Sequence, residues 1–203
     1  MEVSRELFFI LLGISMIFNI IFINFLEKRL RSPIKYQIIS FLVSLIPVYF
    51  IETKTLESIL FINVFFILLI YSFIDIKFFE LSNKHYILLI IYSILSFVLS
   101  FFSDTYILHL LSVFAVYVTF FIFDKFVGIE KLGGADVKVM LILSLYFEAT
   151  DVLFFTLITF VVSMLIFILE RIVRKTFCDL QVPMIISIAV AFFISMYSYF
   201  CNF

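Results

Sequence analysis

The chain has 203 residues, of which 65% are hydrophobic, and its mean hydropathy is +1.27. Soluble domains are about 45–50% apolar, so this composition excludes a water-soluble globular fold and indicates an integral membrane protein. The net charge of −1, with the basic residues in short clusters, argues against a nucleic-acid partner.

The apolar runs are continuous rather than alternating, which favours membrane helices over the strands of a β-barrel. We predict an all-α, polytopic integral membrane bundle of about eight transmembrane helices. The runs cover residues 7–26, 36–51, 56–74, 86–102, 106–123, 138–147, 152–169 and 183–201. We expect one domain, residues 1–203, with an N-terminal helical pair (1–55) and a six-helix core (56–203). The shortest run, 138–147, is expected to be tilted, sunk within the bundle, or extended by Asp136 and Val137.

The basic residues indicate the orientation of the helices. Cytoplasmic loops near helix ends collect Lys and Arg. Twelve of the 14 basic residues fall in or beside alternate loops, at Lys28, Arg29, Arg31, Lys35, Lys77, Lys84, Lys125, Lys131, Lys138, Arg171, Arg174 and Lys175. We therefore predict that these loops are cytoplasmic and that both termini lie outside. The same prediction places Asp75 and Asp136 on the cytoplasmic side.

Two aspartates stand at the edges of apolar runs. Asp75 ends one run and Asp136 begins another, and a carboxylate near the bilayer is costly unless it is paired or hydrated. An aspartyl peptidase needs one ionised carboxylate as general base and one protonated carboxyl as acid. Two aspartates on separate helices could supply this pair and share one proton. Gly133, Gly134 and Ala135 carry no bulky side chain, so a substrate could approach the backbone beside Asp136 closely.

Simpler interpretations exist for both aspartates. Asp136 could N-cap a helix that begins at Val137. Asp75 could be an interfacial charge paired with Lys77. A different class of protein also remains open, namely a small transporter or channel subunit in which Asp75 and Asp136 bind a cation or a proton.

The segments around both aspartates resemble the type IV prepilin peptidases, which process pilins, pseudopilins and archaeal flagellins. Phe73-Ile74-Asp75-Ile76-Lys77, followed by Leu81-Ser82-Asn83, is similar to the first motif of that family, with Leu81-Ser82 in place of the common Ile-Pro. Gly133-Gly134-Ala135-Asp136 is similar to its Gly-x-Gly-Asp motif, with Ala135 in place of the second glycine. Ser32-Pro33-Ile34-Lys35-Tyr36 lies where the family has a similar stretch, so the resemblance covers nearly the whole chain.

The resemblance implies a membrane aspartyl endopeptidase with Asp75 and Asp136 as its catalytic residues. It further implies that a short basic leader is removed from type IV pilin-like or flagellin-like precursors at the cytoplasmic face of the cell membrane. The expected partners are these precursors and the lipid bilayer. We expect no cofactor and no metal ion.

Other acids have a less specific role. Three of them flank the two motif loops, namely Glu80, Asp124 and Glu130. Their charge could attract a basic leader, or they could be ordinary solvated loop charges. We expect the acids of the opposite face to be solvated, including Glu57, Glu148 and Asp151.

The loop at residues 27–35 is short and contains no cysteine. The bifunctional bacterial members of the resembled family carry a cysteine-rich zinc domain at this place, and a structural zinc site takes about four Cys or His ligands. We therefore expect an archaeal-like form that cuts its precursor without methylating it.

Overall fold

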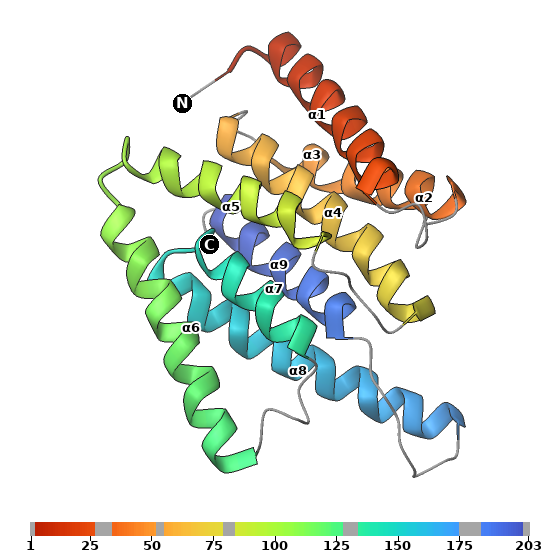
Figure 1. Cartoon of the computed structure of the whole chain (residues 1–203). Coiled ribbons are helices and arrows are strands. Elements are labelled where there is room, and N and C mark those ends of the chain that lie inside the picture. Colours follow the sequence, from red (N-terminus) through yellow and green to blue (C-terminus); the bar gives the residue numbers. More distant parts are fainter. Residues whose placement is uncertain are drawn as a thin grey trace.

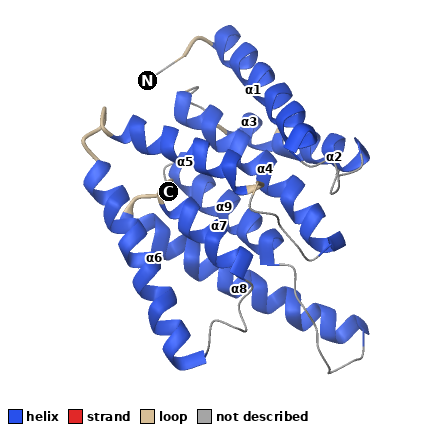
Figure 2. Ribbon diagram, in the orientation of Figure 1, coloured by secondary structure: helices blue, strands red, loops and turns tan. Residues whose placement is uncertain are grey.

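The computed structural model describes residues 3–26, 34–51, 55–78, 84–127, 134–174 and 184–200. The regular elements in these ranges are α-helices, without a strand (Figures 1 and 2). In chain order they are α1 (Arg5–Leu26), α2 (Ile34–Ser44), α3 (Ile46–Phe50), α4 (Leu56–Phe78), α5 (Tyr86–Ser100), α6 (Tyr106–Val127), α7 (Gly134–Ser144), α8 (Ala149–Arg174) and α9 (Met184–Phe200). The predicted all-α helical bundle is confirmed.

Three of these helices contain segments that are long and apolar enough to cross a membrane, namely Arg5–Phe25, Leu56–Ile76 and Asp151–Leu169. Shorter apolar helices lie at Ile34–Phe50, Tyr86–Ser100, Tyr106–Ile122 and Met184–Tyr197. Large apolar side chains are exposed along α1, α6 and α8. Such a surface is unfavourable in water, so the fold is that of an integral membrane protein.

The helix α4 is the centre of the bundle and packs against α1, α2, α5 and α9 (Figure 1). Within the 18-residue window that could cross a membrane, 78% of α4 is buried, against 28% of α1 and 22% of α8. The mean hydropathies of the three segments are similar, at 2.5, 2.4 and 2.9. Burial by neighbouring helices, rather than hydropathy, therefore distinguishes the central helix.

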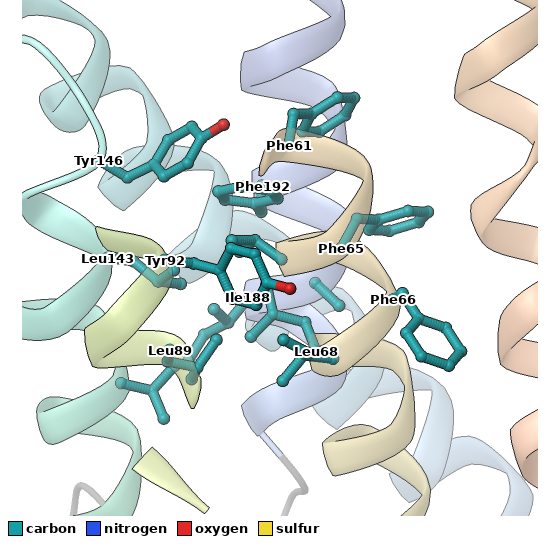
Figure 3. Packing of buried hydrophobic residues seen from close by; sticks show 14 of the residues in the cluster. Phe61, Phe65, Phe66, Leu68, Leu89, Tyr92, Leu143, Tyr146, Ile188 and Phe192 are labelled. Atoms are coloured by element: carbon teal, nitrogen blue, oxygen red, sulfur yellow. The ribbon is translucent and has the colours of Figure 1, made fainter. Parts of the chain in front are cut away.

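The core at the centre of the bundle is built from large aliphatic and aromatic side chains of α4, α5, α7 and α9 (Figure 3). Phe61 of α4 packs against Phe192 of α9 with ring centroids 5.5 Å apart. Leu89 and Leu143 bring α5 and α7 into the same cluster. Between helices in lipid this close packing is a main source of stability, because the lipid tails are as apolar as the side chains.

A polar network crosses the apolar core and joins α1, α4 and α5. Asn19 and Asn63 are fully buried. The Asn19 amide donates to Asn63 Oδ1 (2.7 Å), and the Asn63 amide donates to Ser15 Oγ (2.8 Å). The hydroxyl of Tyr92 donates to Asn19 Oδ1 (2.9 Å). The network satisfies polar groups that would otherwise be costly within a membrane.

The second predicted helix, 36–51, is interrupted in the structure. The chain turns at Leu45 between α2 and α3. Pro47 explains the break, since proline has no backbone N–H and its ring clashes with the carbonyl four residues earlier in a helix. The N–H of Val48 instead donates to the carbonyl of Leu45 (3.1 Å).

The helix α7 is shifted toward the N-terminus relative to the predicted run 138–147. It begins at Gly134, so Asp136 lies inside its first turn. It ends at Ser144 because the next residues form a turn that places the rings of Tyr146 and Phe147 against Phe192, at centroid distances of 5.3 and 5.5 Å. The helix end could not be predicted, because the last turn of the helix and the packed turn after it are equally apolar in the sequence.

Candidate active site

Asp75 lies near the C-terminal end of α4 and is only 8% exposed. Tyr71 precedes it by one helical turn and therefore lies on the same face. The hydroxyl of Tyr71 donates a hydrogen bond to the carbonyl oxygen of His85, and the two rings meet edge to face at 5.1 Å. These contacts fix the start of α5 beside Asp75.

The carboxyl of Asp75 also meets the start of α9. Its partner there is the backbone N–H of Ile185, the second residue of that helix. The first N–H groups of a helix have no partner within the helix and carry the positive end of its dipole, so they favour a carboxylate. The other oxygen, Oδ2, is buried and has no hydrogen-bond partner among the described residues. One oxygen of Asp75 is thus held, and the other is left for a reacting group.

Asp136 is the third residue of α7 and is also 8% exposed. Val139, Met140 and Leu143 follow at i+3, i+4 and i+7, and all three are fully buried. Residues at this spacing share one face of a helix. The same face that carries Asp136 therefore points into the bundle.

The two aspartates, distant in the sequence, come together through a third helix. α5 packs against both α4 and α7, as Figure 1 shows. The carboxyl groups of Asp75 and Asp136 lie close enough for their charges to interact. Two neighbouring carboxylates repel each other, so the pair favours a state with a single negative charge.

The environment of Asp136 favours its protonated form. Burial, together with the negative charge of Asp75, raises the pKa of Asp136 to about 7. Asp136 lies outside the candidate membrane spans, in the first turn of a helix of 11 residues. The N-terminus of a helix favours a negative charge by only about 0.3–1 kcal/mol, which the burial of Asp136 outweighs.

Two further contacts involve residues close in sequence to the two aspartates. The Lys138 Nζ atom lies 5.7 Å from the ring centroid of Tyr86, within the range of a cation–π interaction. On the other side, the ring of Tyr36 in α2 stacks on Phe73, two residues before Asp75, at 4.8 Å. The stretch around Tyr36 that carried part of the family resemblance therefore packs near the end of α4.

The other predicted site residues are only partly described. Gly134 and Ala135 form the beginning of α7, although their side-chain surroundings lie outside the described part. Gly133, Glu80 and Glu130 fall outside the described residues, and Asp124 belongs to α6 with a side chain that is not described. The simpler interpretation of Asp136 as an N-cap is wrong, because α7 begins two residues before it. The suggested partner of Asp75, Lys77, has a side chain outside the described part.

A second group of acids lies at the opposite end of the bundle. Glu57 is in the first turn of α4, about 27 Å along the helix from Asp75. Glu57, Glu148 and Asp151 line a cavity of about 40 Å³ together with His109, whose Nδ1 donates to the carbonyl of Leu145 (3.0 Å). All three acids are half-buried, so each keeps part of its surface exposed. No group of His, Cys, Asp and Glu among the described residues is arranged to hold a metal ion.

Two groups at the aspartate pair were not anticipated from the sequence. The role of the Ile185 N–H cannot be recognised in the sequence, because every residue except proline has a backbone N–H. Tyr86 does have a weak signal, as a polar aromatic residue at the start of an apolar run and only a few residues after a motif loop. Its proximity to both aspartates depends on the packing of α5 between α4 and α7.

A comparison with known proteins identifies the family of this chain. The family model of the type IV leader peptidases matches residues 62–169, which is more than half of the chain and includes both Asp75 and Asp136. Neither a search of curated proteins nor a search of solved structures gave a significant match. The match over these residues agrees with the resemblance in the sequence. The chain belongs to the type IV leader peptidase family and is a membrane protease.

Proposed function

We propose that this protein is an aspartyl endopeptidase with Asp75 and Asp136 as its catalytic pair. Its substrates are type IV pilin-like or flagellin-like precursors, from which it removes a short basic leader. The observation that carries the proposal is a pair of buried carboxyl groups, on α4 and α7, whose charges interact. Both lie within the part of the chain that matches the leader peptidase family.

The environments of the two carboxyls support different roles. Both carboxyls are buried, which disfavours a charge, but the N–H of Ile185 at the start of α9 offsets part of this cost at Asp75, so we assign Asp75 as the ionised partner. Its Oδ2 atom, which has no hydrogen-bond partner among the described residues, accepts a proton from the attacking water. Asp136 is the protonated partner, in keeping with its pKa of about 7. It donates its proton to the oxygen of the scissile carbonyl.

The proposed reaction returns both groups to their starting states. Water loses a proton to Asp75 and adds to the carbonyl carbon, while Asp136 protonates the carbonyl oxygen, giving a neutral tetrahedral diol. When the carbon–nitrogen bond breaks, Asp75 passes its proton to the leaving nitrogen. One hydroxyl of the diol returns a proton to Asp136. These reaction steps require one ionised and one protonated carboxyl. Two carboxyls whose charges interact favour this singly charged state.

The proposed site faces the cytoplasm, as the alternate basic loops indicate, in the cell membrane. Glu80, Asp124 and Glu130 attract the basic leader by opposite charge, which mainly raises the rate of encounter. Gly133, Gly134 and Ala135 leave space for the substrate backbone beside Asp136. The hydrophobic segment that follows the leader remains in the bilayer.

Purified protein in liposomes should cut a precursor in which a basic leader precedes a hydrophobic segment. Mass spectrometry of the products would show one cut between the two parts. A precursor with the leader Lys and Arg residues replaced by Gln serves as the control and should be cut more slowly at low salt. A cation or proton flux through the same liposomes, with no cut in the precursor, would instead support the transporter.

A further inference from the structure

Tyr86 begins α5 at the place where this helix meets both α4 and α7. Its side chain is 5% exposed. Its phenol group lies close enough to Asp75 and Asp136 to interact with the charges of both. A hydrogen-bond donor that is neutral at physiological pH therefore lies within electrostatic range of both carboxyls.

The position of this tyrosine is restrained from several sides. The residue before it, His85, accepts a hydrogen bond at its carbonyl oxygen from Tyr71, on the same face of α4 as Asp75. The ammonium group of Lys138, two residues after Asp136, lies 5.7 Å from the centroid of the Tyr86 ring. α4 thus holds the residue before Tyr86, and Lys138 of α7 contacts its ring. A donor held in place needs little reorganisation during a reaction.

The hydroxyl of Tyr86 makes no hydrogen bond to a described residue. Tyr92, on the same helix and 7% exposed, provides a contrast, because its hydroxyl is engaged by Asn19 Oδ1 at 2.9 Å. The hydroxyl of Tyr86 is therefore able to donate to a group that enters near the two aspartates.

We propose that Tyr86 is a further catalytic residue, whose hydroxyl donates a hydrogen bond to the oxygen of the scissile carbonyl as negative charge develops there. This inference rests on the proposed function. Asp136 supplies the proton to that oxygen, and Tyr86 stabilises the charge before the transfer is complete. Tyr86 keeps its own proton, so the balance of the reaction is unchanged.

The variant Tyr86→Phe tests the proposal, because it removes the hydroxyl and keeps the ring that Lys138 contacts. We expect kcat for precursor cleavage to fall about 100-fold with KM nearly unchanged, since the bond strengthens in the transition state. Tyr92→Phe is the matched control. It removes a hydroxyl of similar burial from the same helix and breaks a hydrogen bond to Asn19, so it measures the effect of lost stability alone.

Asp75→Asn and Asp136→Asn belong in the same assay. If both are inactive and Tyr86→Phe keeps a kcat within about threefold of the wild type, the role of Tyr86 is refuted while the aspartyl mechanism stands. An equal fall in kcat for Tyr86→Phe and Tyr92→Phe would also refute it, as would a change in KM alone. If either aspartate variant cleaves normally, the proposed function itself fails.

Discussion

The charge state of Asp136 predicts how cleavage depends on pH. In the proposed mechanism Asp136 is the acid, so the active form is the protonated one, and this form is lost as the pH rises through its pKa of about 7. The protonated fraction falls from about 0.9 at pH 6 to about 0.1 at pH 8. We therefore expect kcat/KM to fall about tenfold between these two pH values, and about tenfold more for each further unit.

The assay is cleavage of a precursor peptide that has no group titrating between pH 6 and 9, in detergent at constant ionic strength. Asp151→Asn is the control, because it removes a half-buried carboxyl at the opposite end of the bundle. This variant should show the same decrease of kcat/KM between pH 6 and 8 as the wild type. A kcat/KM that stays level or rises from pH 6 to 8 would refute the assignment of Asp136 as the acid.

Three further results are expected. Asn19→Ala should lower the unfolding free energy in detergent by about 1–3 kcal/mol, because Asn63 and Tyr92 each lose a partner; the exposed Ile17→Ala on the same helix should cost less, and equal losses would contradict the network. A precursor processed with S-adenosylmethionine present should keep an unmodified N-terminus, whereas a gain of one methyl group in mass spectrometry would contradict this. Replacing Glu80, Asp124 and Glu130 with Gln or Asn should raise KM for the precursor at low salt but not at high salt. An unchanged KM at low salt would show that these acids have no role in leader binding.

The helical segments could be predicted from the sequence because membrane solvation leaves a strong pattern. A run of about 20 apolar residues is needed to cross the bilayer, and charged breaks separate one run from the next. The start of α4 at Leu56 and of α6 at Tyr106 agree with the predicted runs 56–74 and 106–123. The break between α2 and α3 was missed although Pro47 lies inside the run, because apolarity was given more weight than the local effect of proline.

The candidate site could be predicted only as far as side-chain chemistry marks it. A carboxylate in an apolar setting is costly, and this drew attention to Asp75 and Asp136. The N–H of Ile185 and the hydroxyl of Tyr86 reach the pair through the packing of α9 and α5, which no local pattern encodes. The half-burial of the acids at the opposite end likewise depends on tertiary packing.

Tertiary packing also decides the environment of each aspartate. In the sequence both are single acids beside apolar runs, with no feature that assigns them separate roles. In the structure Asp75 meets the start of α9, whereas Asp136 is buried beside Asp75. In the proposed mechanism, the difference between base and acid thus arises from helices that are distant in the sequence.

The most direct test of the catalytic pair is the cleavage rate of Asp75→Asn and Asp136→Asn, each purified in the same detergent and checked for unchanged helical content. Asparagine preserves the shape of the side chain but can neither accept a proton as a base nor donate one as an acid at neutral pH. Glu148→Gln, at the opposite end of the bundle, is the matched control for loss of a carboxyl. The account predicts that both aspartate variants lose cleavage by about 1,000-fold or more while Glu148→Gln retains it. Cleavage near the wild-type rate by either aspartate variant would contradict it.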